Sequence, residues 1–406
     1  MRNDALDRFL RANATALPEP FDGVTAPLAL LETLAERIAG ADIVALGETN
    51  HFIHEKSDFR LLFARYLLSL GWSDFVEELG WSDGHRVESY LCSGAEAELD
   101  RLPSFGYTAH LRQDRDDRPG GILKLESYPT AAFLWEQKRF YRGLRAEAAR
   151  REQQVRLAGI DIDALPGGSY EDIAELLPND AKNGDALLSA LRRRPGESAR
   201  AEAERLRHAL TLIPPGWSPE IAEAVRALSD SLDYIAMTYG AESYEVLRPG
   251  IAFRENAMKR RLTAARGLFG TSRLVVMAHA LHLAKDDRVI KGSGVGPGGN
   301  IASSLGHWLA REQQQKVVSV WLLYGGGEDC QPLASLPRRA CFPAHSLNRQ
   351  LARFGRPLLF FPADAPELFG EPSVVGHMYN SLIATPLAAQ ADAVLFLPRV
   401  TPLRTK

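Results

Sequence analysis

The chain has 406 residues, a formal net charge of -3 and a hydrophobic fraction of 45%. These values are typical of a globular protein with one large α/β domain or two to three average domains. The near-neutral charge favours neither nucleic acid nor an anionic membrane as a partner, and no run of about 18 apolar residues could span a bilayer. Without a secretory signal, and with three widely spaced cysteines, we expect a cytoplasmic monomer or small homo-oligomer.

The first 91 residues predict helices followed by a strand–loop–helix–strand unit. Residues 1–40 are helical in pattern, with a break at residues 18–27. The apolar run 43–46 predicts a strand that ends at Gly47, so Glu48 and His51 are expected in a loop. Apolar residues at spacings of three and four between Phe59 and Leu70 predict a helix that Gly71 ends. Phe75 and Val76 begin a second strand, and Glu77 and Glu78 are expected at its end.

The next segment contains a long loop, a helix and a strand. Residues 92–125 lack a periodic pattern, and within them residues 112–118 are dense in charge and residues 119–121 predict a turn. Residues 130–144 predict an aromatic-rich helix with a charged continuation to 154. Residues 155–160 predict a strand that is closed by Asp161 and Asp163.

Residues 166–266 predict a helical lobe because no good strand pattern occurs in them. The clearest helix begins with Ser218 as N-cap and Pro219 in the first position. Its apolar stripe indicates a face turned to a core and consists of Ile221, Val225, Leu228, Leu232, Ile235 and Tyr239. We expect this lobe to set the choice of substrate, since it interrupts an α/β pattern.

Strand patterns resume after the lobe. Their ranges are 273–277, 317–323, 357–361 and 393–397, with a glycine loop at 292–299 and a helix from about 301. Strands that alternate with helices indicate a mainly parallel β-sheet flanked by helices, with the all-helical lobe inserted. The predicted domains are an α/β core of residues 1–165 and 267–406, and the lobe.

Polar residues gather at three predicted strand ends. Glu48 and His51 follow the first strand, Glu78 follows the second, and His279 and His282 follow a later one. Ligands bind outside the carboxyl ends of parallel strands, so these residues are candidates for one acid/base site. Histidine titrates near neutral pH, and a carboxylate can orient its ring.

Each motif also has a structural interpretation. The histidine pair can be a hydrogen-bonded structural pair, Glu48-x-x-His51 alone is a common surface pattern, and Arg60 can be solvated. A metal site made by the histidines stays possible, although no zincin motif, no nucleophile elbow and no zinc-finger cysteine spacing occurs. The glycine loop from Gly294 is a poor dinucleotide fingerprint because it lies far from its preceding strand.

A series of short motifs follows in one order from about residue 43 to 397. They are Gly47-Glu48-x-x-His51-Phe52 with Glu55 and Arg60, Glu78-x-Gly80, Gly159-Ile-Asp161, Arg254-Glu255-x-x-Met258, Ala278-His279-Ala280-Leu281-His282, Leu305-Gly306-x-x-Leu309 and Asp392-Ala393-Val394. This ordered set resembles the erythromycin esterase family. One residue departs from the family pattern, since Ala280 stands where an asparagine is usual.

The resemblance implies a metal-independent hydrolase that opens macrolide lactones without a cofactor. It implies that His51 is the general base for water. Glu48, Glu78, Arg60, His279 and His282 would line the site as further catalytic residues. We add as candidates for substrate binding Phe52, Glu55, Trp81, Arg254 and Asp161.

Three hypotheses therefore stand. The leading one is a carboxylic-ester or lactone hydrolase, in which Glu48 or Glu78 holds His51. Arg60 with His279 or His282 would stabilise the oxyanion and protonate the leaving group. The second is a biosynthetic enzyme that uses the same cluster for acyl transfer, cyclisation or elimination. The third is a non-catalytic protein that binds a metal or another ligand through its histidines.

Overall fold

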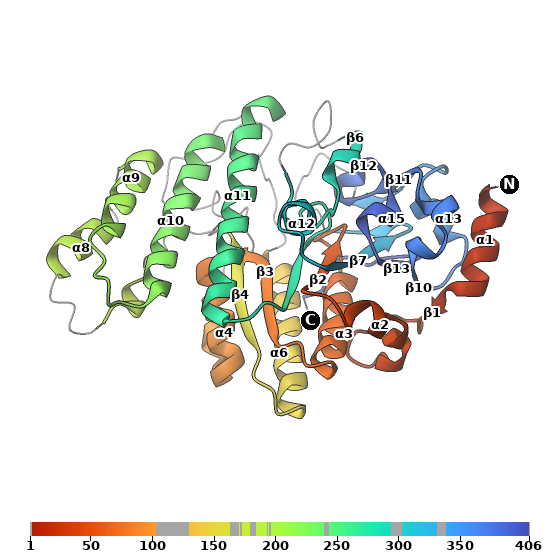
Figure 1. Ribbon diagram of the computed structural model, residues 1–406, viewed down its shortest axis with the longest axis horizontal. Helices are drawn as coiled ribbons and strands as arrows, with labels where there is room; N and C mark the ends of the chain where they lie inside the picture. The colour runs from red at the N-terminus through yellow and green to blue at the C-terminus, as the bar shows by residue number, and fades with distance from the viewer. Residues whose placement is uncertain are drawn as a thin grey trace. The chain divides into compact units, whose positions relative to one another are not determined.

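The structure is a computed structural model that describes residues 2–102, 130–162, 170, 173–178, 184–192, 194, 196–238, 243–293, 303–330 and 338–405. The predicted loops at 112–118 and 119–121 lie outside these residues, as does most of the glycine loop at 292–299. The strands of the main sheet are, in spatial order, β1 (Thr15–Ala16), β10 (Leu358–Phe360), β13 (Ala393–Leu397), β7 (Val317–Tyr324), β2 (Ile43–Glu48), β5 (Leu274–His279), β3 (Asp74–Gly80) and β4 (Arg156–Asp161). Figure 1 shows this sheet and its helices, and the predicted α/β class is confirmed.

The chain forms two compact units. The first comprises Met1–Phe75, Leu125–Arg156 and Gly270–Lys406, and the second comprises Val76–Lys124 and Leu157–Phe269. The predicted lobe at 166–266 lies within the second unit, which also contains most of β3 and β4.

Strand β2 is the central strand of the first unit. It pairs in parallel with β5 on one side and with β7 on the other, and all six of its residues are buried. Parallel strands that are covered on both faces have continuous apolar sequences, which is why β2 could be predicted. Gly47 leaves no room for a side chain here, because an added Cβ would lie 3.0 Å from the Cα of Ala280 and 3.3 Å from the Trp321 ring.

The strand directions change towards one edge of this unit. β13 runs parallel to β7, whereas β10 is antiparallel to β13 and β1 is antiparallel to β10. The bounds predicted for β13 are those observed. The prediction for β5 ended too early, since the strand continues to His279, and β2 likewise extends to Glu48.

Helices cover the sheet of the first unit. They are α1 (Arg2–Asn13), α2 (Ala35–Ile38), α3 (Glu55–Ser69), α6 (Thr130–Arg150), α12 (Leu305–His307), α13 (Leu347–Ala352), α14 (Pro366–Phe369) and α15 (Leu387–Gln390). α3 packs against α6, and Gly71 follows α3 with φ 78°, the left-handed conformation typical of a helix end. A large apolar cluster joins Leu10 of α1, Leu351 of α13 and Phe369 of α14 to Phe360 and Phe396 of the sheet.

A small antiparallel sheet in this unit was not predicted. Its strands are β11 (Pro372–Gly376), β12 (Leu382–Pro386) and β6 (Lys291–Ser293). β6 begins one residue before the predicted glycine loop and covers its first two residues. The turn between β11 and β12 carries His377, and Met378 donates its backbone N–H to Thr49 O at 2.8 Å, so this turn lies against the loop that follows β2.

The second unit contains α4 (Trp81–Ser93), α5 (Glu96–Asp100), α8 (Gly184–Leu191), α9 (Ala199–Leu210), α10 (Pro219–Thr238) and α11 (Tyr244–Phe269). α9 and α11, drawn in green in Figure 1, both pack against α10. In the described part of residues 166–266 every regular element is a helix, as predicted. Ser218 accepts the backbone N–H of Glu220 at the start of α10, and the stripe predicted for α10 is buried from Ile221 to Ile235.

Candidate active site

The end of β2 places the first site residue. Glu48 is the last residue of β2 and is fully buried. In the parallel register Glu48 lies opposite His279, the last residue of β5. From the sequence, both residues were predicted to lie just beyond their strands. The strands instead include them, and the pairing continues because Ala280 donates its backbone N–H to Glu48 O at 2.8 Å.

Glu48 holds both His51 and Arg60. The Oε1 atom of Glu48 lies 3.0 Å from His51 Nδ1. The Arg60 guanidinium donates to both Glu48 oxygens, with Nε at 3.2 Å from Oε2 and Nη2 at 2.9 Å from Oε1. Burial alone would raise the pKa of Glu48, but the Arg60 charge and the His51 hydrogen bond outweigh burial and lower the pKa to about 2. Glu48 is therefore a carboxylate at neutral pH that accepts the Nδ1 proton of His51.

The charge of Arg60 is in the interior because helix α3 is buried on nearly all sides. Arg60 is 4% exposed, so the solvated arginine considered from the sequence is not observed. A buried charge must be paired, and Glu48 supplies the opposite charge. Arg60 is thereby committed to holding the carboxylate that holds His51.

Two histidines from the end of β5 lie beside His51. The ring centroids of His51 and His279 are 5.0 Å apart, and those of His279 and His282 are 6.4 Å apart. The backbone N–H of Leu281 lies 3.3 Å from His279 Nδ1, so a neutral His279 ring carries its proton on Nε2. His282 is the more exposed member of the pair.

A further histidine in this cluster was missed from the sequence. The His377 ring centroid lies 5.6 Å from that of His279 and 6.1 Å from that of Trp321. His377 is 1% exposed, and among the described residues neither of its ring nitrogens has a hydrogen-bond partner. Burial lowers the pKa of His377 to about 3, so the ring is neutral at physiological pH. The only sequence signal was a Gly-His pair after two valines, which is too weak to predict the strand before it.

Two predicted substrate-binding residues of this unit have protein partners. Phe52 is fully buried and its ring lies 6.0 Å from that of His51, in an edge-on arrangement. Glu55 is 8% exposed, and both of its carboxylate oxygens accept the backbone N–H of Thr401. Phe52 therefore packs edge-on against His51, and Glu55 binds the C-terminal segment.

The second unit holds its own charged cluster. Arg254 of α11 donates Nε to Asp161 Oδ1 at 2.7 Å and Nη2 to Glu78 Oε1 at 2.8 Å. All three side chains are at most 10% exposed. Trp81 begins α4 and packs into the apolar core of the helical region. The structure thus brings Glu78, Arg254 and Asp161 together, from motifs that are 176 and 93 residues apart.

The glycine in the motif before Asp161 has a packing role. An added Cβ at Gly159 would lie 1.9 Å from Gly80 O, and one at Gly84 would lie 2.0 Å from Gly159 N. β4 and the start of α4 therefore approach closely only because both positions are glycine. This close approach accounts for the glycine of the Gly-Ile-Asp motif.

Within the described residues, one group of side chains has the spacing for a metal ion, namely Asp286, Asp287 and His307. Arg288 donates to both oxygens of Asp286, at 2.9 and 2.8 Å. Asp287 accepts the backbone N–H of Ser304 and lies 3.3 Å from His307 Nδ1. These partners are those of an ion-paired cluster. The site histidines do not belong to this group.

No described helix is long and apolar enough to cross a bilayer.

No family model matches the sequence, and no curated protein matches it significantly. Solved structures do match. A protein from Bacillus cereus gives a TM-score of 0.72 at 15% identity, covering 100% of this chain and 99% of that chain. A succinoglycan biosynthesis protein gives 0.71 at 16% identity with the same coverage. A histidine-to-asparagine mutant of the erythromycin esterase EreC, in its open conformation, gives 0.65 at 16% identity, covering 96% and 98%.

This chain has the erythromycin esterase fold. The fold that the resemblance implies is thereby confirmed, and the structural similarity covers 96% of this chain. Within this fold, one cluster of the first unit contains Glu48, His51, Arg60, His279 and His282. A second cluster, in the second unit, contains Glu78, Arg254 and Asp161.

Proposed function

We propose that the protein is a hydrolase of carboxylic esters or lactones in which His51 is the general base. The observation that carries this proposal is the Glu48–His51 pair, with 3.0 Å between Oε1 and Nδ1. Because ionised Glu48 holds the Nδ1 proton, Nε2 becomes the basic nitrogen of the His51 ring. A water that loses its proton to Nε2 would attack the ester carbonyl, and general-base assistance of this kind contributes typically ~10²–10⁴-fold.

Glu48 stabilises the imidazolium that His51 becomes after it takes the proton. The pKa of Glu48, about 2, keeps the carboxylate negative throughout the reaction. Arg60 keeps Glu48 ionised and fixes its plane by donating to both oxygens. We therefore assign Arg60 as the residue that holds Glu48, in place of the oxyanion role that the sequence suggested.

His279 and His282 are assigned to the oxygens of the reacting ester. A neutral His279 donates from Nε2, and its ring lies 5.0 Å from that of His51, so it can stabilise the negative charge that develops on the carbonyl oxygen. His282, whose ring lies 6.4 Å from that of His279, is the more exposed of the two, which suits proton donation to the leaving alkoxide. Arg254, Glu78 and Asp161 pair with one another in a buried cluster of the second unit, and we assign this cluster to the stability of that unit.

The test is a panel of esters and lactones, including macrolides, incubated with the purified protein in heavy-oxygen water. Mass spectrometry should show a product that gains one water and carries one heavy oxygen in its carboxylate. The test variant is His51→Gln, which should abolish most of the product. The matched control is His345→Gln, because His345 is an exposed histidine whose replacement should leave the product unchanged. The absence of any water-gain product across the panel would reject hydrolysis.

A biosynthetic reaction is the second candidate. One of the similar structures is described as a succinoglycan biosynthesis protein, with a TM-score of 0.71. The same base can deprotonate a substrate hydroxyl in place of water, which gives acyl transfer or cyclisation. In the panel this reaction would produce a mass change other than the gain of one water, and no heavy oxygen would enter the product.

A further inference from the structure

The loop that carries His51 is held by distant parts of the chain. At its start Thr49 donates both its backbone N–H and its hydroxyl to Leu322 O, at 3.3 and 2.8 Å. Asn50 donates its side-chain amide to Tyr324 Oη and Asp329 Oδ2, each at 3.0 Å. The first half of the loop is thus fixed to β7 and the segment that follows it.

The second half of the loop is held by residues 400–404, which we call the C-terminal strap. His54 donates its backbone N–H to Thr401 O at 3.0 Å. Ile53 forms an antiparallel bridge with Pro402. The strap therefore pairs as a short strand with the residues directly after His51.

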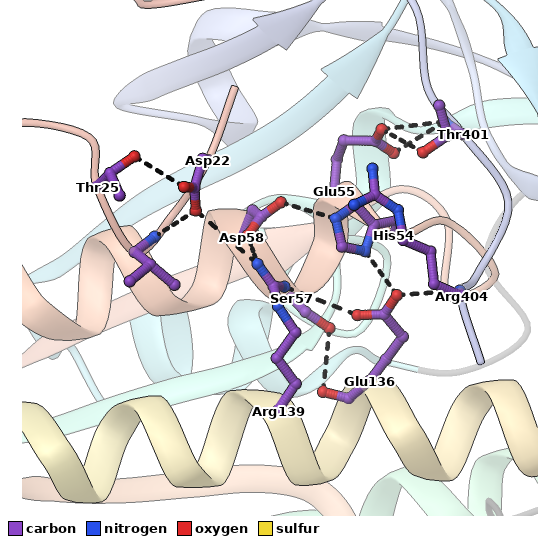
Figure 2. Close-up of polar contacts among 11 residues, drawn as sticks. Asp22, Thr25, His54, Glu55, Ser57, Asp58, Glu136, Arg139, Thr401 and Arg404 are labelled. Carbon is purple, nitrogen blue, oxygen red and sulfur yellow. Dashed lines mark hydrogen bonds and ion pairs between the residues drawn. The ribbon is translucent and has the colours of Figure 1, made fainter. Parts of the chain in front are cut away.

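Glu55 binds the strap with its side chain. Thr401 donates its backbone N–H to both Glu55 oxygens, at 3.1 and 3.0 Å, and its hydroxyl to Oε1 at 2.7 Å, as Figure 2 shows. Glu55 is the first residue of α3, where a carboxylate also interacts well with the helix dipole. These three hydrogen bonds fix the start of α3 from outside the helix.

Next to Glu55, a buried ion cluster secures the same point. His54 lies between two carboxylates, with Nδ1 at 2.6 Å from Glu136 Oε1 and Nε2 at 3.2 Å from Asp58 Oδ2. The strap reaches this cluster as well, since Arg404 donates its backbone N–H to Glu136 Oε1 at 3.1 Å. Figure 2 shows the contacts of Thr401 with Glu55 and of Arg404 with Glu136.

The position of α3 determines the geometry at Glu48. Arg60, which donates to both oxygens of Glu48, lies about 1.4 turns after Glu55 in the same helix. His51, which binds Glu48 Oε1, lies four residues before Glu55. Any shift of the start of α3 therefore moves both partners of Glu48 together.

We propose that Thr401 and Glu55 are positioning residues that set the orientation of His51 and Arg60 towards Glu48. This role places both residues outside the reacting groups, and it replaces the substrate-binding role expected of Glu55. The kinetic consequence of this inference rests on the proposed function, whereas its geometric consequence at His51 does not.

The test uses the full chain with three variants. Thr401→Val keeps the branched shape and the backbone N–H but removes the hydroxyl. Thr401→Ser restores the hydroxyl. Thr25→Val is the matched control, because Thr25 donates its hydroxyl to Asp22 Oδ2 at 2.7 Å in an exposed position of the same unit.

The first readout is solvent exchange of the His51 Nδ1 proton, followed by NMR. It should accelerate about tenfold in Thr401→Val, the scale of one hydrogen bond to a charged group. Wild-type exchange is expected in Thr401→Ser and Thr25→Val. Thr401→Val with a lowered melting temperature but unchanged exchange at His51 would overturn the proposal, because that is the result of a merely structural contact.

The second readout is kinetic and uses an ester that the wild type hydrolyses. In Thr401→Val, kcat should fall about 10- to 100-fold, since small misplacements of catalytic groups have effects of this size, while KM stays within about threefold. An unchanged kcat would contradict the inference. If the wild type hydrolyses no ester, the proposed function fails, and the exchange at His51 still decides the positioning role.

Discussion

His54 gives the sharpest prediction about stability, because it lies buried between two carboxylates. Burial alone would lower its pKa, but the hydrogen bonds to Asp58 and Glu136 outweigh burial and raise the pKa from 6.5 to about 9. Arg139 faces the same carboxylates, at 2.5 Å from Asp58 and 3.7 Å from Glu136. His54 is therefore an imidazolium in the folded protein at neutral pH.

The sign and size of the effect follow from linkage. The folded pKa of His54 lies above the unfolded one, so its stabilisation is complete below pH 6.5 and is lost as the pH rises through 9. A difference of 2.5 pKa units, from 6.5 to about 9, corresponds to about 3 kcal/mol of unfolding free energy.

The assay is urea unfolding at a series of pH values. The wild type should lose about 3 kcal/mol of unfolding free energy between pH 6.5 and 10. His54→Gln should be less stable at pH 6.5 and should lack most of this decline. Equal declines in both proteins, or an NMR titration of His54 with a midpoint near 6.5, would refute the reasoning.

Further predictions concern the other buried groups. His377, whose pKa burial lowers to about 3, should stay neutral by NMR from pH 5 to 9, and a protonation midpoint above 5 would contradict this. Because the unfolded chain binds a proton below pH 6.5 that folded His377 does not, His377→Leu should reduce the loss of stability on acidification. Arg254→Gln should lower the unfolding free energy by about 3 to 5 kcal/mol, since it leaves the buried Glu78 and Asp161 carboxylates without a counter-charge. A loss below about 1 kcal/mol in urea unfolding would show that this cluster is not buried as described.

The fold could be predicted from the sequence where strands are buried on both faces. β2, β7 and β13 are continuous apolar runs, and their ranges were predicted nearly as observed. The antiparallel direction of β10 could not be predicted, because direction depends on which strand it pairs with. The small sheet of β11, β12 and β6 has strands of three to five residues, too short for a periodic pattern.

The candidate site was predictable only in part, for a related reason. Glu48 and His279 could be expected near each other because the carboxyl ends of parallel strands meet at one edge. His377 enters from a turn of the small sheet, which the sequence did not predict. Glu55 was recognised as a neighbour of the site, but its partner Thr401 lies 346 residues away and only the folded chain brings them together.

The most direct test of the account is the turnover of His51→Gln on an ester that the wild type hydrolyses. Circular dichroism must first show that the variant is folded, and equilibrium binding must show that it still holds the substrate. The account predicts a fall in kcat by about two to four powers of ten, the contribution of a general base. A folded His51→Gln variant with near-normal kcat would contradict the role of His51, and with it the mechanism proposed for this site.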